Sequence, residues 1–155
     1  MLVRITRAAL LLSAVALATF LLTGCEEAKP VLKYVFILGP DGTFKVEGGT
    51  YKDYRVSVTE GMLQWGDKQA TIYVNLDTEG GHAANCSFYI FDALEFLTYQ
   101  VQGHATPLNE TNNTHACTMW ATVSEPGDYY VVIKDFDDYG HTFEGHIYVT
   151  YWEMK

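Results

Sequence analysis

The sequence is poor in basic residues and in cysteine, and it lacks an apolar run long enough for a membrane helix. Its 155 residues include ten Lys and Arg against 19 Asp and Glu, which gives a formal net charge of −9. Such an acidic surface excludes nucleic acid as a partner. The longest run of small and apolar residues, from Ala8 to Leu22, is shorter than the roughly 20 residues that a transmembrane helix needs.

Signatures of enzymatic chemistry are also missing. The sequence contains no Gly-x-Ser-x-Gly, no His-Glu-x-x-His and no phosphate-binding glycine loop. Its histidines mostly neighbour glycines or polar loop residues, where an exposed His is more common than a ligand. We therefore expect a protein that is not an enzyme.

The first 25 residues have the pattern of an export signal. Arg4 and Arg7 precede the apolar run, which ends at the four residues Leu22-Thr23-Gly24-Cys25. These four residues resemble the lipobox of bacterial lipoproteins, in which the cysteine receives diacylglycerol and becomes the new N-terminus. The resemblance implies a lipoprotein signal peptide over residues 1–24 and lipidation of Cys25. The alternative is an ordinary secreted protein in which Cys25 is an incidental thiol.

A lipidated Cys25 would attach the protein to a membrane without a transmembrane helix, because each buried methylene contributes about 0.8 kcal/mol. Residues 25–30 would then be a short tether, and residues 31–155 a single domain. The mature part from Cys25 onward has a formal charge of −11, because Arg4 and Arg7 are removed with the signal peptide. We expect an extracytoplasmic protein, anchored on the periplasmic face of a membrane or at the cell surface.

The mature part of the chain predicts an all-β fold. Turn residues recur every eight to twelve positions, and β-branched and aromatic residues fill the segments between them. This pattern predicts an antiparallel β-sandwich of eight or nine strands, jelly-roll or immunoglobulin-like in type. The polar segment 103–115 is interpreted as one long surface loop. The expected strands are Val31–Leu38, Thr43–Glu47, Tyr54–Thr59, Ala70–Leu76, Ser87–Phe91, Thr118–Val123, Tyr129–Phe136 and Thr142–Trp152.

Two pairings are expected from proximity along the chain. The turn cluster from Gly39 to Gly42 predicts a hairpin between the first two strands. The last two strands are expected to pair in the same way. This second hairpin matters because several candidate ligand-binding side chains lie on it.

The C-terminal part resembles a known group of domains. Glu125–Asp135, followed by a short acidic loop and the strand His146–Tyr151, resembles the last hairpin of small secreted sandwiches of the GOLD and pre-peptidase C-terminal (PPC) type. Ser87–Asp92 is similar to an earlier strand of those domains. Cys117 departs from the pattern, because GOLD-type proteins tend to place a cysteine in the final hairpin. The resemblance implies a non-catalytic accessory or binding module.

Cys86 and Cys117 remain if Cys25 is lipidated, and we expect a disulfide between them in an oxidising compartment. Free thiols are one alternative. A tetrahedral metal site that adds His82 and His115 is another, although neither spacing matches a structural zinc knuckle.

An acidic cluster at Asp135, Asp137 and Asp138 is the candidate cation site. Calcium binds six to eight oxygens on flexible loops, and Asp128 and Glu144 are expected nearby if the last hairpin forms. The alternative is a solvated turn whose charges discourage edge pairing. We expect no cofactor other than this calcium ion.

Tyr130, Tyr148 and Trp152 would share one face of the last hairpin, where flat rings can stack on sugar rings. The alternative is ordinary cross-strand packing of aromatic residues.

The preferred function is thus a lipid-anchored, non-catalytic binding or scaffolding module of the cell envelope that recognises a glycan or another envelope protein. One alternative is a self-assembling surface or fibre subunit in which Val31–Leu38 pairs with a neighbouring sheet edge. A metal-dependent secreted enzyme is the second alternative.

Overall fold

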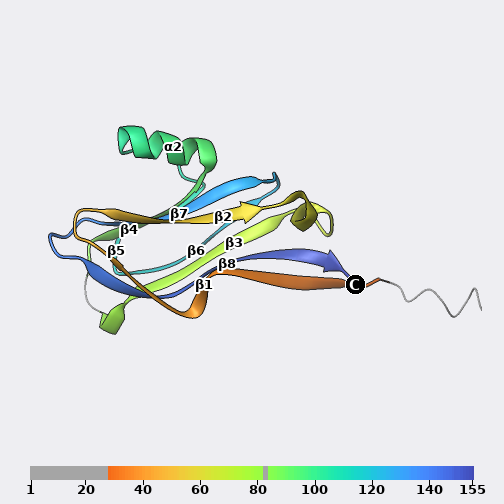
Figure 1. Ribbon diagram of the computed structural model, residues 1–155, viewed down its shortest axis with the longest axis horizontal. Helices are drawn as coiled ribbons and strands as arrows, with labels where there is room; N and C mark the ends of the chain where they lie inside the picture. Colours follow the sequence, from red (N-terminus) through yellow and green to blue (C-terminus); the bar gives the residue numbers. More distant parts are fainter. Residues whose placement is uncertain (1–27, 82–83) are drawn as a thin grey trace, which may run out of the picture. The chain divides into compact units, whose positions relative to one another are not determined.

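The structure describes residues 28–81 and 84–155. In this part of the chain, eight strands form two four-stranded antiparallel sheets. This computed structural model confirms the predicted β-sandwich, which comprises Pro30–Met154 (Figure 1). None of the helices in the described ranges combines the length and apolar character needed to cross a bilayer. The elements are β1 (Pro30–Val46), β2 (Tyr51–Val58), η1 (Glu60–Leu63), β3 (Ala70–Thr78), η2 (Glu79–Gly81), β4 (Cys86–Asp92), α2 (Ala93–Gln102), β5 (Asn109–Thr114), β6 (Ala116–Val123), β7 (Gly127–Asp135) and β8 (His141–Met154).

The strand order is β1-β8-β3-β6 in one sheet, called sheet A here, and β2-β7-β4-β5 in the other, called sheet B. Alternate residues of each strand point into the space between the sheets, as the period of two in the sequence predicts. In β3, for example, Ile72, Val74 and Leu76 are buried, whereas Tyr73 and Asn75 face outward. Phe88, Ile133 and Phe143 are among the large side chains that fill the core.

The helix α2 covers the outer face of sheet B (Figure 1). Phe96 and Tyr99 of α2 form a second, smaller core with Phe91 and Val132 of the sheet. β4 is therefore buried on both faces, which explains its nearly continuous apolar sequence. The all-β pattern of the sequence did not predict this helix. Its beginning is marked by Asp92, whose side chain accepts a hydrogen bond from the backbone N–H of Glu95.

The predicted hairpin between Val31–Leu38 and Thr43–Glu47 is wrong. Both segments belong to β1, and both pair with β8. The register shifts between Phe36 and Gly42, so the turn residues form an irregularity within one long strand rather than a reversal.

The predicted loop over residues 103–115 is also wrong in part. Its second half is β5, which pairs with β4 at the edge of sheet B. The sequence of β5, Asn-Glu-Thr-Asn-Asn-Thr, has no apolar alternation because its side chains are exposed or only half-buried. The pattern that reveals the other strands is therefore missing.

The predicted pairing of the last two strands is wrong as well. β7 lies in sheet B and β8 in sheet A, so the chain crosses between the sheets through residues 136–140. Gly140 lies directly against the backbone of Val46 and Glu47, where a Cβ atom would clash. This crossover places the start of β8 beside the end of β7 and creates the buried cluster described below.

Candidate functional site

Four aromatic side chains form a continuous row across the outer face of sheet A. Phe36 on β1 is opposite Tyr148 on β8, Tyr148 is opposite Tyr73 on β3, and Tyr73 is opposite Trp120 on β6. Directly opposed residues of an antiparallel pair project from the same face. We call Phe36, Tyr148, Tyr73 and Trp120 the aromatic row. It spans three gaps between strands, or about 14 Å.

Ring contacts order the centre of the row. Tyr73 and Tyr148 stack with centroids 5.1 Å apart and an interplanar angle of 15°. Phe36 and Tyr34 lie 5.4 and 5.8 Å from Tyr148, and His146 lies 5.3 Å from it. These contacts support Tyr148 from three sides, so its ring has little freedom to move.

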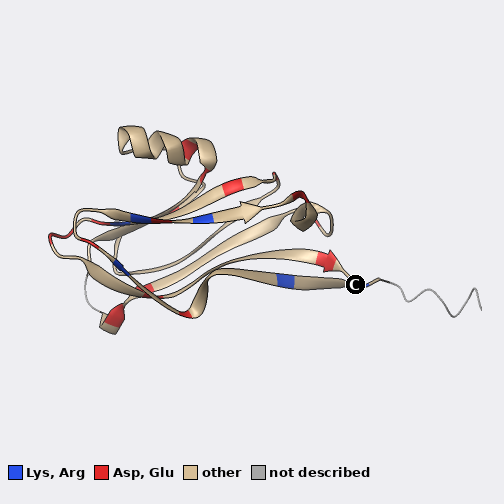
Figure 2. Cartoon of the chain, viewed as in Figure 1, with Lys and Arg blue, Asp and Glu red and all other residues tan. Residues whose placement is uncertain are grey.

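The row is open to solvent at both ends. Phe36 is 49% exposed and Trp120 is 56% exposed, whereas Tyr73 and Tyr148 are half-buried between them. The central stretches of β3 and β8 that carry the row contain no Lys, Arg, Asp or Glu (Figure 2). The exposed aromatic surface at the centre of sheet A is therefore uncharged, although the composition of the protein is acidic.

A polar hollow adjoins the row on the same sheet. It has a volume of about 390 Å³, and its lining includes Asn75 and Asp77 of β3, Glu144 of β8 and Asp41 of β1. Asn75 is opposite His146, the next outward pair after Tyr73 and Tyr148. The lining contains three carboxylates and neither Lys nor Arg. Hydrogen-bond acceptors thus lie beside the centre of the aromatic row.

The structure separates the three aromatic residues that sequence analysis placed together. Tyr148 and Trp152 lie on the outer face of sheet A, and Trp152 is 40% exposed. Tyr130 lies in sheet B, where its ring stacks on Phe96 of α2 with centroids 4.0 Å apart. Tyr130 is therefore packed beneath the helix and belongs to a different surface.

Sequence analysis did not find Phe36, Tyr73 or Trp120. Alternation along their strands predicts outward side chains for Tyr73 and Trp120, whereas Phe36 lies in a segment that is apolar on both faces. Their alignment in one row depends on the order and register of four strands, which no local pattern contains.

The predicted calcium ligands do not form a common site. Asp135 is fully buried, and its Oδ1 accepts the Asp137 N–H at 3.0 Å while its Oδ2 accepts the His141 N–H at 3.1 Å. Asp137 accepts the Asn85 N–H at 3.0 Å. Asp138 is exposed. The carboxylates of Asp135 and Asp137 therefore accept backbone N–H groups at the crossover between the sheets and stabilise its conformation.

The two additional carboxylates lie elsewhere. Asp128 binds Arg55 at 2.7 Å and accepts the Ser57 hydroxyl at 2.7 Å, and these hydrogen bonds lower the pKa of Asp128. Glu144 lies in sheet A, opposite Asp77 and Thr43. Calcium at the acidic loop stays a prediction without a converging set of oxygens.

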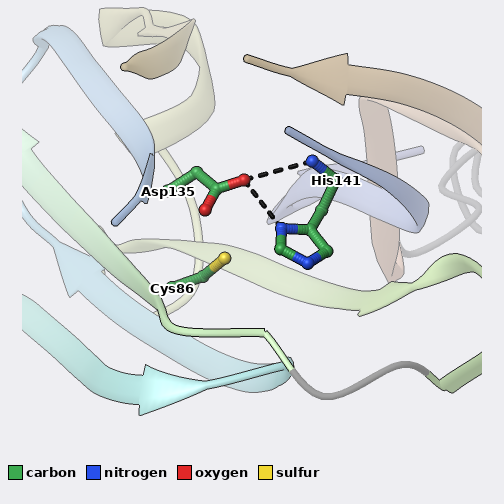
Figure 3. Close-up of side chains that lie close together, drawn as sticks. All are labelled: Cys86, Asp135 and His141. Carbon is green, nitrogen blue, oxygen red and sulfur yellow. Dashed lines mark hydrogen bonds and ion pairs between the residues drawn. The ribbon is translucent and has the colours of Figure 1, made fainter. Parts of the chain in front are cut away.

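A buried polar cluster lies where β4, β7 and β8 meet. Cys86, Asp135 and His141 each offer one ligating atom, and these atoms lie within 4.8 Å of one another (Figure 3). Within residues 28–81 and 84–155 it is the one group of at least three His, Cys, Asp or Glu side chains placed closely enough to hold a metal ion. Sequence analysis missed it because it joins the first residue of β4, the last of β7 and the first of β8.

The electrostatics of the cluster are set by burial. His141 Nδ1 lies 2.8 Å from Asp135 Oδ2, and His141 Nε2 lies 3.6 Å from Asp137 Oδ2. Burial, followed by the neighbouring Asp135 and Asp137 carboxylates, raises the pKa of the Cys86 thiol to about 12. Cys86 is therefore a neutral thiol in the metal-free protein at physiological pH.

Both cysteines that were expected to form a disulfide are free and buried in this structure. Cys86 is on β4 of sheet B and Cys117 is on β6 of sheet A, where burial raises the pKa of its thiol to about 12. The disulfide thus stays a prediction. His115 is exposed between β5 and β6. His82 and the lipobox residues Leu22-Thr23-Gly24-Cys25 lie outside the described residues.

Neither a protein-family model nor a curated protein sequence matches the chain. Solved structures match its fold. They include the Yersinia pseudotuberculosis-derived mitogen (6% identity, TM-score 0.42, covering 79% of this chain and 86% of that one). They also include the PPC domain of a Bacillus anthracis collagenase, with 11% identity and a TM-score of 0.31, covering 79% of this chain and 88% of that one. A third is the xylan-binding module CBM86 of Roseburia intestinalis, with 19% identity and a TM-score of 0.35, covering 84% of this chain and 91% of that one. The chain is similar to these proteins as a β-sandwich.

Proposed function

We propose that the protein is a non-catalytic, lipid-anchored module of the cell envelope that binds polysaccharide on the outer face of sheet A. The observation that carries the proposal is the aromatic row, in which Phe36, Tyr148, Tyr73 and Trp120 are consecutive register partners. Sugar rings have an apolar face of C–H groups and a rim of hydroxyls. They stack on exposed aromatic rings and donate hydrogen bonds to nearby oxygens.

The adjoining hollow indicates which polysaccharides fit. Asp41, Asp77 and Glu144 accept hydrogen bonds from hydroxyl or amino groups, and they repel uronate, sulfate and phosphate groups. We therefore expect neutral or amine-bearing glycans to bind more tightly than anionic ones. The negative net charge of the mature protein, −11 once Arg4 and Arg7 are removed, acts in the same direction.

A binding assay with substitutions in the row tests this proposal. We expect Trp120→Ala and Tyr148→Ala to weaken binding to a neutral polysaccharide about tenfold each, which corresponds to about 1.4 kcal/mol. Trp65→Ala is the matched control, because Trp65 is 43% exposed but lies outside the row. Trp152→Ala tests how far the surface extends along β8. Absence of binding to a panel of neutral and amino-sugar polysaccharides, or equal affinity of Trp120→Ala and wild type, would reject the glycan site.

The membrane anchor is a separate part of the proposal. It rests on Leu22-Thr23-Gly24-Cys25 and on the charged and apolar segments before them. Mass spectrometry of the native protein is expected to find an N-terminal Cys25 that carries diacylglycerol, and a Cys25→Ser variant is expected to stay unprocessed. An intact, unacylated amino end would remove the anchor and leave the glycan site as proposed.

A second candidate function is self-assembly through β1. This strand is at the edge of sheet A, and Leu32, Tyr34 and Val35 are exposed on it. An exposed edge strand with apolar side chains is a template for pairing with another chain. Concentration-dependent oligomers in size-exclusion chromatography that Leu32→Lys and Val35→Lys abolish would favour assembly, whereas a monomer at all concentrations would exclude it.

A further inference from the structure

We propose that Cys86, Asp135 and His141 form a binding site for a borderline transition-metal ion such as Zn²⁺. Thiolate sulfur, imidazole nitrogen and carboxylate oxygen are the three donor types that zinc sites use. The corresponding atoms lie within 4.8 Å of one another in the metal-free protein. Ligand atoms around a tetrahedral zinc ion are separated by about 3.3 to 3.8 Å, so closure of the site requires movements of roughly 1 Å.

The three side chains are held by the backbone rather than by flexible loops. Cys86 and Asp135 are register partners on β4 and β7, and the Asp135 carboxylate is fixed by the N–H groups of Asp137 and His141. Figure 3 shows the Cys86 thiol directed toward Asp135 and the His141 ring. Ligands that are positioned before the ion arrives lose little conformational entropy on binding.

Asp137 has the position of an orienting carboxylate. Its Oδ2 lies 3.6 Å from Nε2 of His141, whereas Nδ1 of the same ring faces Asp135. A carboxylate at one ring nitrogen leaves the other nitrogen free of its proton for a metal ion, an arrangement that recurs in zinc proteins. Zinc binding here replaces the hydrogen bond between Asp135 and His141 with metal bonds and releases the thiol proton of Cys86 to solvent.

A hollow beside His141 offers an access route to the cluster. His141 is part of the lining of a hollow of about 670 Å³, together with Thr142, Gly140 and residues of η2. An ion can therefore reach the ring from this side. Three protein ligands and one open position are typical of zinc sites that bind water or another small ligand.

Cobalt titration of the purified, reduced full chain tests the site. Co²⁺ bound by a thiolate in a tetrahedral site gives a sulfur-to-cobalt charge-transfer band in the near ultraviolet and strong ligand-field bands in the visible range. We expect both sets of bands, displaced by one equivalent of Zn²⁺. Absence of the charge-transfer band in the wild-type protein overturns the proposal.

Cysteine variants provide a matched pair. Cys86→Ser is expected to lose the charge-transfer band, whereas Cys117→Ser, which removes a buried thiol outside the cluster, is expected to keep it. His141→Gln is expected to bind Co²⁺ at least tenfold more weakly. An unchanged band in Cys86→Ser, or its loss in a folded Cys117→Ser, contradicts the assignment.

Thermal unfolding gives a readout that does not depend on whether the cluster variants fold. One equivalent of Zn²⁺ is expected to raise the Tm of wild type and of Cys117→Ser by several degrees, because binding only to the folded state stabilises it. An unchanged Tm in both proteins overturns the proposal. Glycan binding involves a different surface, so its result is independent of this one.

Discussion

Asp135 Oδ2 contacts both the backbone and the side chain of His141, accepting the N–H at 3.1 Å and lying 2.8 Å from ring Nδ1. The other oxygen of Asp135 accepts the Asp137 N–H. One fully buried carboxylate thus fixes the segment in which the chain crosses from sheet B to sheet A.

Asp135→Ala is expected to lower the free energy of unfolding by about 2–4 kcal/mol, because it leaves buried donors without partners. Urea unfolding in the presence of a chelator measures this change. Asp138→Ala is the control, since Asp138 is an exposed residue of the same segment, and its effect should stay within about 0.5 kcal/mol. Equal stability of the two variants would show that the Asp135 network contributes nothing to folding.

The two buried thiols give a second prediction. Cys86 and Cys117 are 0% and 2% exposed, so neither should react with a thiol reagent in the native protein. If both are free, as in this structure, denaturation without a reductant should make both reactive. Protection that persists in the denatured, unreduced protein would instead establish the disulfide that the cysteine count predicts.

The strands themselves were largely predictable from the sequence, because alternate burial leaves a local signal. β2, β3 and β6 follow from alternation of apolar and polar residues. β5 was missed because neither of its faces is well buried. The helix α2 was missed because its outward side carries Leu94, Leu97 and Val101, which are exposed, so no clear amphipathic pattern marks it.

Pairing between strands was less predictable, and the candidate sites depend on it. Tyr148 was identified, but its partners Phe36 and Tyr73 come from strands distant in the sequence. The buried cluster brings Cys86 together with Asp135 and His141 through the crossover between sheets. Such contacts are set by topology, and consecutive strands do not always pair.

Stability is expected to fall at alkaline pH. Burial raises the pKa of Tyr54, Tyr99, Cys86 and Cys117 to about 12, from ordinary values of 10.0 for Tyr and 9.0 for Cys. The unfolded chain therefore loses these protons at lower pH than the folded protein does. The stabilisation is complete below pH 9 and is lost as the pH rises from about 9 to about 12.

Thermal melts between pH 7 and pH 12 measure this dependence. The Tm should be nearly constant up to about pH 9 and then fall. Tyr54→Phe and Tyr99→Phe should each make the fall shallower, because each removes one group that must stay protonated in the folded state. A Tm that is independent of pH up to 12 would contradict the burial of these groups.

The N-terminus of α2 offers a prediction about local stability. Asp92 accepts the Glu95 N–H at 2.8 Å and is the N-cap of the helix. Asp92→Ala should destabilise the protein by about 1 kcal/mol, and Asp92→Asn by less, because Asn also caps helices well. Chemical denaturation of the two variants makes the comparison, and an equal loss in both would assign the effect to charge instead of capping.

Tyr130 and Tyr148 provide a test that separates packing from binding. Tyr130 stacks on Phe96 at 4.0 Å under α2, whereas Tyr148 stacks on Tyr73 at 5.1 Å on the open face of sheet A. Tyr130→Ala should lower the free energy of unfolding by about 2–4 kcal/mol, because it removes the ring on which the helix packs. It should leave the affinity for a neutral polysaccharide unchanged.

Tyr148→Ala should show the opposite balance, with weakened binding and a smaller loss of stability. If Tyr130→Ala weakens binding as much as Tyr148→Ala does, the glycan surface must involve sheet B, and the aromatic row would not be the binding site.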